Sequence, residues 1–158
     1  MNKQPVIIIV AMTETRLIGK GNELPWHISG DLQHFKRQTL GNTVIMGHNT
    51  YLSLKRPSLP GRNNIVISPE LDSNEHITVC RTLDEALNTG QELGKKIFIM
   101  GGAYTYEHAL PYADYLYVSM VKKDYEGDVY FPIFEVDHWT KESSEDMGEF
   151  VFIRYKRS

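Results

Sequence analysis

Five short apolar runs, rich in β-branched residues, mark the first two thirds of the chain. They are VIIIVAM (6–12), TVIMG (43–47), NIVIS (64–68), ITVC (77–80) and KIFIMG (96–101). Runs that are apolar on both faces are typical of buried strands in a parallel sheet. The pattern therefore predicts five buried strands.

Helical patterns lie between these strands. Thr82 and Glu85 form a capping box at the start of one helix, and Ser29 is placed to cap another. Alternating strands and helices predict a single α/β domain over residues 1–158, with a mostly parallel central sheet and helices on both faces. The helices are expected at 29–39, 49–54, 83–91 and 103–109.

The C-terminal part of the chain has a different pattern. YLYVSMV (115–121) reads as one more buried strand. Segments 138–145 and 150–156 flank a turn at Gly148. We expect them to form an antiparallel hairpin at the edge of the sheet.

Composition narrows the class of protein. The 158 residues are 41% hydrophobic and 23% charged, and the formal net charge of −3 offers no broad basic field for nucleic acid. The run 6–12 is too short to span a bilayer. Cys80 is the single cysteine, so a disulfide within the chain is excluded and a reducing compartment is the natural location. We expect a cytoplasmic protein with neither a membrane nor a nucleic-acid partner.

Asp31 lies in an unexpected place on the first predicted helix. Ile28, Leu32 and Phe35 share one stripe, which should face the interior, and Asp31 falls on that stripe or at its edge. Burying an unpartnered carboxylate costs several kcal/mol. Two readings stay open at this point: an acid that complements the helix dipole, or a functional acid that binds a ligand with matching donors.

Two strand-to-helix connections have the same sequence pattern, which is suited to binding phosphate. TVIMG runs into HNTYLSL, and KIFIMGG runs into AYTYEHAL, so that each buried strand ends in glycine before a helix. Free N–H groups at a helix start favour phosphate, and two such junctions suggest a dinucleotide. The glycines also fit ordinary tight turns, and no G-x-G-x-x-G fingerprint is present.

Other chemistry finds little support, apart from one arginine loop. The six histidines show no metal-ligand spacing, and the chain has no G-x-S-x-G nucleophile motif. The loop RPSLPGR (56–62) is stiffened by two prolines and presents Arg56 and Arg62. These are either solvated loop arginines or a receptor for a carboxylate, which guanidinium grips with two parallel hydrogen bonds.

Several of these segments together resemble bacterial dihydrofolate reductases over essentially the whole chain. The resemblance is carried by the segments IGKGNELPWHISGDLQHFKRQTLG, VIMGHNTYLSL, RPSLPGRNNIVIS, IMGGAYTYEHALP and YEGDVYFP. It implies that NADPH delivers hydride from its nicotinamide C4 to C6 of 7,8-dihydrofolate while N5 gains a proton. Asp31 is then the acid that accepts hydrogen bonds from the pterin, with a water reaching N5.

The resemblance also implies roles for other residues. The segment from Ile18 to Trp26 matches a loop that closes over the nicotinamide, and Leu24 and Trp26 join Asp31 in the catalytic group. Arg62 is expected to bind the α-carboxylate of the substrate's glutamate tail, with Lys36 and Arg56 nearby. The other implied substrate contacts are Ile9, Leu32, Phe35, Leu54, Met100, Tyr106 and Ser119.

The implied cofactor site covers both glycine junctions. Backbone groups of Ala11 and Ile18 are expected to hold the nicotinamide carboxamide, and a cis Gly101–Gly102 bond is expected beside the pyrophosphate. The implied contacts to NADPH are Ala11, Ile18, Gly19, Lys20, Asn22, Gly47, His48, Asn49, Thr50, Ser68, Pro69, Arg81, Gly101, Gly102, Ala103, Tyr104 and Thr105.

The chain departs from the family pattern at three places. His48 stands where relatives usually have the arginine that meets the adenosine 2′-phosphate, so weaker and more pH-sensitive discrimination against NADH is expected. The loop KRPSLPGR is one residue longer than is common, and the hairpin around Gly148 is shorter.

Two alternatives remain beside a monomeric reductase of this family. One is a pyrimidine reductase of riboflavin synthesis, and the other is a nucleotide-binding module without catalysis. Asp31 and Arg62 argue against both.

Overall fold

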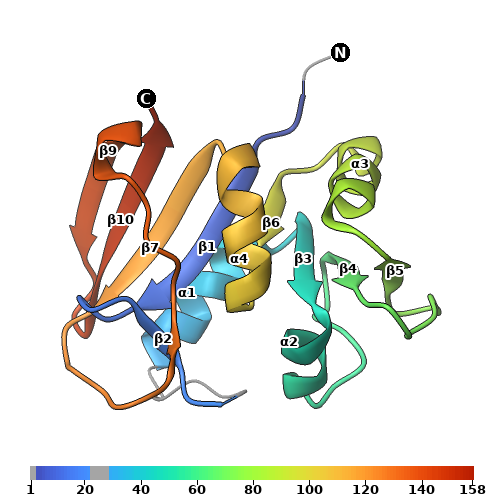
Figure 1. Cartoon of the computed structure of the whole chain (residues 1–158), viewed down its shortest axis with the longest axis horizontal. Coiled ribbons are helices and arrows are strands. Elements are labelled where there is room, and N and C mark those ends of the chain that lie inside the picture. Colours follow the sequence, from blue (N-terminus) through green and yellow to red (C-terminus); the bar gives the residue numbers. More distant parts are fainter. Residues whose placement is uncertain (1–2, 22–28) are drawn as a thin grey trace.

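The computed structural model describes residues 3–21 and 29–158. Its centre is an eight-stranded sheet in the order β5-β4-β3-β6-β1-β7-β10-β9 (Figure 1). The strands of this sheet are β1 (Val6–Met12), β3 (Thr43–Gly47), β4 (Asn63–Ile67), β5 (Thr78–Cys80), β6 (Ile97–Ile99), β7 (Tyr115–Val121), β9 (Trp139–Asp146) and β10 (Phe150–Arg157).

The first six of these strands run parallel. In β1, Ile8 lies opposite Ile99 of β6 on one side and opposite Leu116 of β7 on the other. β10 then pairs antiparallel with both β7 and β9. The predicted mostly parallel sheet and its antiparallel C-terminal edge are both confirmed.

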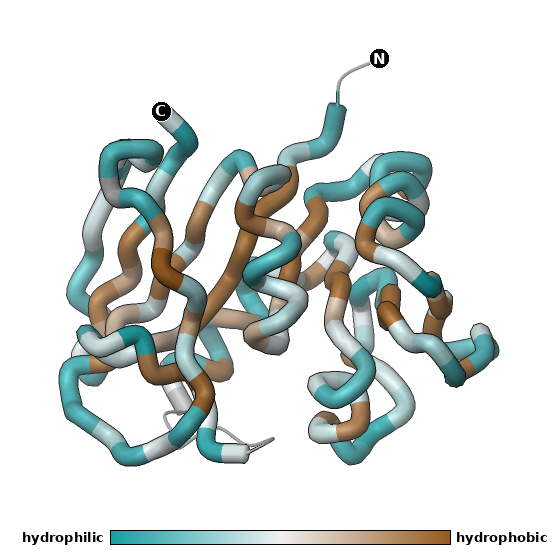
Figure 2. The backbone as a smooth tube through the Cα atoms, viewed as in Figure 1, coloured by the Kyte–Doolittle hydropathy of each residue, from teal (hydrophilic) through white to brown (hydrophobic). Residues whose placement is uncertain are grey.

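Helices cover both faces of the sheet, as predicted. α4 lies in front of β1 and β6 in Figure 1, whereas α1 lies behind the sheet. Figure 2 shows the most hydrophobic segments along the central strands, with hydrophilic segments in the loops around them. The helices are α1 (Ser29–Thr39), α2 (His48–Ser53), α3 (Leu83–Leu93) and α4 (Ala103–Ala109), with 3₁₀ turns η1 (Leu110–Tyr112) and η2 (Val136–His138).

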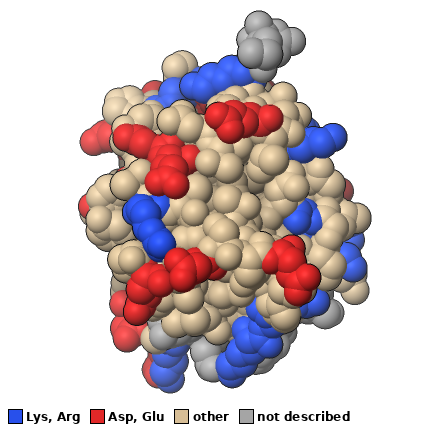
Figure 3. All heavy atoms as spheres, turned by 90° about the vertical axis from the view of Figure 1, so that its right-hand side faces the viewer, with Lys and Arg blue, Asp and Glu red and all other residues tan. Residues whose placement is uncertain are grey.

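Charged side chains of both signs share the surface. On the side of the molecule that carries α3 and the β4–β5 end of the sheet, Lys and Arg are scattered among Asp and Glu (Figure 3). This mixture matches the small formal net charge of −3. Among the described residues, no helix is long and apolar enough to cross a membrane.

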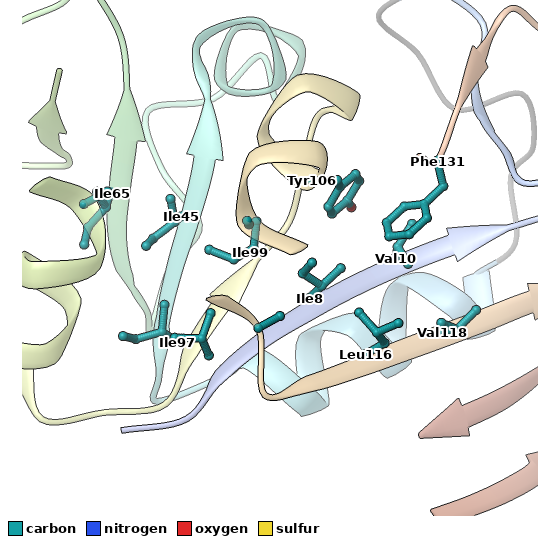
Figure 4. Close-up of a cluster of buried hydrophobic side chains, with 14 of the residues drawn as sticks. Ile8, Val10, Ile45, Ile65, Ile97, Ile99, Tyr106, Leu116, Val118 and Phe131 are labelled. Carbon is teal, nitrogen blue, oxygen red and sulfur yellow. The ribbon is translucent and has the colours of Figure 1, made fainter. Parts of the chain in front are cut away.

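Alternating side chains of β1 enter two separate hydrophobic layers. Ile8 and Val10 pack under α4 with Tyr106 and Phe131, as Figure 4 shows. Ile7 and Ile9 point to the opposite face, where Phe35 of α1 packs. A strand that is buried on both faces explains why its sequence shows no polar alternation.

One expectation for α1 is wrong and one is not tested. The predicted cap depends on the Ser29 side chain, which lies outside what the structure describes, so it stays a prediction. Leu32 is 56% exposed, whereas Asp31 and His34 are buried. The His34 ring packs against Phe152, with 4.2 Å between ring centroids, and this contact fixes which side of the helix faces the sheet. The side of α1 that faces the sheet therefore carries Asp31 and His34 as well as Phe35, and Leu32 lies outside it.

The cap of α3 agrees with the prediction. The Thr82 side chain accepts a hydrogen bond from the Glu85 backbone N–H at 3.1 Å. The Glu85 carboxylate in turn accepts one from the backbone of Arg81, one residue before the cap. The box is therefore closed, with its return bond displaced by one position.

A small second sheet was not predicted. It pairs β2 (Leu17–Gly19) with β8 (Val129–Tyr130). Strands of three and two residues are too short to show a periodic pattern. Gly127 permits the close approach, since a Cβ there would lie 2.4 Å from the carbonyl oxygen of Gly19.

Candidate active site

The strand connections change direction between β3 and β6, which are neighbours in the sheet. From β3 the chain continues through α2 to β4, on the side away from β6. From β6 it continues through α4 to β7, on the opposite side. In open α/β sheets, ligands bind in the crevice outside the carboxyl ends of strands at such a point.

Glycines bring the two loops at this crevice into close contact. The Gly47 N–H donates to the Gly101 carbonyl oxygen at 2.8 Å. A Cβ on Gly47 would lie 2.9 Å from Thr105 Oγ1, and one on Gly102 would lie 3.3 Å from Thr50 Oγ1. The Gly101–Gly102 bond is cis, as expected. A side chain at Gly47 would require Thr105 to move, and one at Gly102 would be a tight fit against Thr50, so the glycines allow the backbones of the two loops to approach each other closely.

Asp31 lies on the side of α1 that faces the sheet, where it is 7% exposed. Its negative charge, together with burial as the larger cause, raises the pKa of Tyr106. The Tyr106 hydroxyl donates to the carbonyl oxygen of Ile9 at 2.9 Å. Ser119, also buried, lies on β7 opposite Ala11. A carboxylate is therefore held inside the protein within electrostatic reach of Tyr106, and complementing the helix dipole does not require it to be buried.

Arg62 is held in position above an aromatic ring. Its Nη1 donates to Thr39 Oγ1 at 3.1 Å, and its Nε donates to the Pro60 carbonyl oxygen at 3.1 Å. The guanidinium lies 6.0 Å from the centre of the Phe35 ring. Burial, and then the charge of Arg56, lower the pKa of Arg62. Two guanidiniums that repel each other favour an anion between them.

Sequence reasoning missed Thr39, because a threonine in the last turn of a helix carries no motif. Its hydroxyl also donates to the Phe35 carbonyl oxygen at 2.9 Å, so its lone pair is oriented toward Arg62.

A polar cluster follows the carboxyl ends of β3, β4 and β5. His48 Nδ1 lies 2.8 Å from Ser68 Oγ, and Arg81 Nη1 donates to the Ser68 carbonyl oxygen at 2.9 Å. Glu70 completes the cluster, with Oε1 3.4 Å from His48 Nε2. Glu70 could not be selected from the sequence, because an acid in the loop after a strand is common.

The other expected site residues differ in how far they are exposed to solvent. Ala11, Ile18, Phe35, Leu54, Met100, Gly102 and Ala103 are half-buried, and Ile9, Gly19, Gly101 and Thr105 are buried. The exposed ones are Lys20, Leu32, Lys36, Asn49, Arg56, Pro69 and Tyr104. Asn22, Leu24 and Trp26 lie outside the described residues.

These features define a class of protein. A crevice lined by backbone suits a dinucleotide, and a buried acid beside it suits a polar heterocycle. Among the described residues, no group of His, Cys, Asp and Glu is arranged to hold a metal. The fold and site together are those of a nucleotide-dependent oxidoreductase with a small-molecule substrate.

Comparison with known proteins identifies the family. The family model "Dihydrofolate reductase" matches residues 5–157. The dihydrofolate reductase of Bacillus subtilis is 43% identical over 89% of this chain and 83% of its own. That of Haemophilus influenzae is 37% identical over 87% of this chain and 85% of its own. The chain belongs to the dihydrofolate reductase family.

A solved structure agrees with this assignment. A dihydrofolate reductase from Enterococcus faecalis, complexed with NADP(H) and RAB-propyl, is 28% identical to this chain. It superimposes with a TM-score of 0.86 over 98% of this chain and 96% of its own.

Proposed function

We propose that this chain reduces 7,8-dihydrofolate to 5,6,7,8-tetrahydrofolate with NADPH, as a cytoplasmic monomer that binds no nucleic acid, and that Asp31 is its catalytic carboxylate. Family membership supports the reaction. The observation that carries the role of Asp31 is its burial on the sheet side of α1, within electrostatic reach of the Tyr106 hydroxyl. A carboxylate in that position is suited to a ligand that brings its own hydrogen-bond donors.

The residues at the crevice fit NADPH. The glycine contacts between Gly47 and Gly101 leave backbone as the surface for a pyrophosphate. Thr50 and Thr105 add hydroxyl donors, and Arg81 adds a cation after β5. Ala11 and Ile18, on β1 and β2, are assigned to the nicotinamide end, which must lie beside the substrate.

Asp31 orients the pterin and polarises it. Its carboxylate accepts hydrogen bonds from the pterin N3–H and 2-amino group, and each such charge-assisted bond is worth about 1.5–3 kcal/mol. Bound NADPH supplies the hydride that C6 accepts. The low dielectric around Asp31 strengthens its effect on the ring, which favours protonation of N5 by a water molecule.

Hydrophobic side chains and Arg62 hold the rest of the substrate. Ile9, Phe35, Leu54 and Met100 contact the pterin and p-aminobenzoyl rings. Arg62, kept in place by Thr39 and Pro60, binds the α-carboxylate of the glutamate tail.

The test is an assay for loss of NADPH absorbance in the presence of dihydrofolate. The unmodified chain is expected to be active, and Asp31→Asn is expected to lose turnover by at least about 100-fold, the scale of general acid–base and electrostatic contributions. The exposed Asp146 serves as the matched control, since Asp146→Asn removes the same charge away from the crevice. Near-normal turnover by a folded Asp31→Asn protein contradicts the role.

A further inference from the structure

The side chains at the β4–β5 end of the crevice determine which dinucleotide the chain accepts, and this inference rests on the proposed function. The substrate lies at the β1 side, beside Asp31, so the nicotinamide must lie there too. The pyrophosphate occupies the switch point between β3 and β6. The adenosine half then extends toward the carboxyl ends of β4 and β5, where His48, Ser68, Glu70 and Arg81 gather.

Ser68 fixes the hydrogen-bonding state of His48. The Ser68 hydroxyl oxygen accepts the backbone N–H groups of Glu70 at 3.2 Å and Leu71 at 3.0 Å. A hydroxyl has two lone pairs and one hydrogen, so its hydrogen remains for the third neighbour, His48 Nδ1 at 2.8 Å. Nδ1 is therefore the acceptor, and neutral His48 carries its hydrogen on Nε2.

Glu70 lies beside that hydrogen. Its Oε1 is 3.4 Å from His48 Nε2, an ion-pair distance, so a carboxylate of this chain stands next to the nitrogen that donates. An incoming phosphate must compete with Glu70 for this donor.

Arg81 is also engaged by its own loop. Its guanidinium donates to the carbonyl oxygens of Ser68 and Leu71 and contacts Asp72 Oδ1 at 3.4 Å. The cluster thus holds two carboxylates, Glu70 and Asp72, against one guanidinium, and it is not net positive even when His48 is protonated. A ribose 2′-phosphate is a dianion at neutral pH, whereas a 2′-hydroxyl is a suitable partner for a carboxylate.

We propose that Glu70 is a specificity-determining residue: its carboxylate lies beside His48 Nε2, opposes a 2′-phosphate, and thereby weakens the preference of the chain for NADPH over NADH. The chemistry that it recognises is the 2′-substituent of the adenosine ribose.

The experiment compares binding of adenosine 2′,5′-bisphosphate with binding of adenosine 5′-monophosphate by calorimetry. Glu70→Gln is expected to tighten the bisphosphate about three- to tenfold, the effect of one exposed charge a few ångströms away, and to leave the monophosphate within about twofold. The gain should shrink in high salt. Steady-state kinetics should show the same change in the NADPH:NADH ratio.

Glu75→Gln is the matched control. Glu75 lies in the same loop and pairs with His76 at the same 3.4 Å separation, but neither residue belongs to the cluster. It is expected to change neither affinity. Nitrogen-15 NMR of His48 gives a reading that does not depend on nucleotide: the Nε2–H form is expected in the unmodified protein and a tautomer mixture in Ser68→Ala.

An unchanged bisphosphate-to-monophosphate ratio in Glu70→Gln overturns the inference and leaves the reductase function intact. Failure of the unmodified chain to bind either nucleotide or to oxidise NADPH overturns both.

Discussion

At the scale of single residues, function depends on polar groups in places where polar groups are costly. Asp31, His34 and Thr39 are all buried on one helix, at 7%, 4% and 0% exposure. Asp31 is the residue that we propose for the substrate site, and Thr39 orients Arg62. His34 has a different position, between α1 and the aromatic side chains of β10.

Arg62→Leu is expected to raise KM for dihydrofolate by at least about tenfold with little change in kcat, because the lost contact to the substrate carboxylate lies away from the reacting atoms. Initial-rate kinetics at saturating NADPH measure both constants. Arg37→Leu, which removes an exposed cation from α1, is the control. An unchanged KM in Arg62→Leu argues against the assignment.

His34 is expected to make the fold sensitive to acid. Burial is the main cause that lowers the pKa of His34 below 6.5, with Arg37 adding to the effect and Glu145 opposing it. The unfolded chain then binds the proton more readily, so stability is complete above about pH 6.5 and falls with decreasing pH until the folded state is protonated too. The slope from this one group cannot exceed about 1.4 kcal/mol per pH unit.

His34→Phe should therefore lose less stability than the unmodified protein between neutral pH and pH 5, as measured by urea unfolding. His76→Phe, at an exposed position, should follow the unmodified protein. Parallel pH profiles for His34→Phe and the unmodified protein would falsify this account.

At the scale of elements, the helices differ in how completely local sequence signals specify their ends. α3 has a complete set of local signals: the Thr82 cap, Asp84 and Glu85 in the first turn, and Gly94 in the left-handed conformation at its end. α2 and α4 have no side-chain cap at their N-termini, where Gly47 and Gly102 stand instead. The capped helix lies away from the switch point, and the two uncapped helices begin beside it.

Removing the cap of α3 is expected to reduce stability without affecting the site. Thr82→Ala should lower the free energy of unfolding by about 1 kcal/mol, since the Glu85 N–H loses its acceptor. Thermal unfolding should show a decrease of about 2–4 °C for a chain of this size. Thr82→Ser keeps the hydroxyl and should restore most of the loss, whereas equal losses in both variants would exclude the cap as the cause.

At the scale of the whole molecule, one sheet connects all parts of the site. β1 lies inside the sheet, where its Ile9 carbonyl oxygen accepts from Tyr106, and the glycine loops that we propose for the cofactor follow strands on one side of it. The two hydrophobic layers lie on opposite faces of this sheet. Displacement of the central strand should therefore affect the entire molecule.

Ile8→Ala tests whether the two hydrophobic layers unfold together. Ile8 is fully buried at the centre of the sheet, so the truncation should cost about 2–5 kcal/mol. Tryptophan fluorescence and far-ultraviolet circular dichroism should report the same shifted urea midpoint. Separate midpoints for the two probes would show that the layers unfold independently.

The sequence alone determined the strands of the central sheet, the helices between them and their order along the chain, because buried parallel strands and the cap of α3 are encoded by neighbouring residues. It also singled out Asp31 and Arg62, since a carboxylate on an apolar stripe and arginines on a stiff loop are visible along the chain. Only the tertiary structure decided that Leu32 faces solvent and that Thr39 orients Arg62. It alone paired β2 with β8 and brought Glu70 to His48. These features depend on contacts between segments far apart in sequence, whose energies no local pattern records.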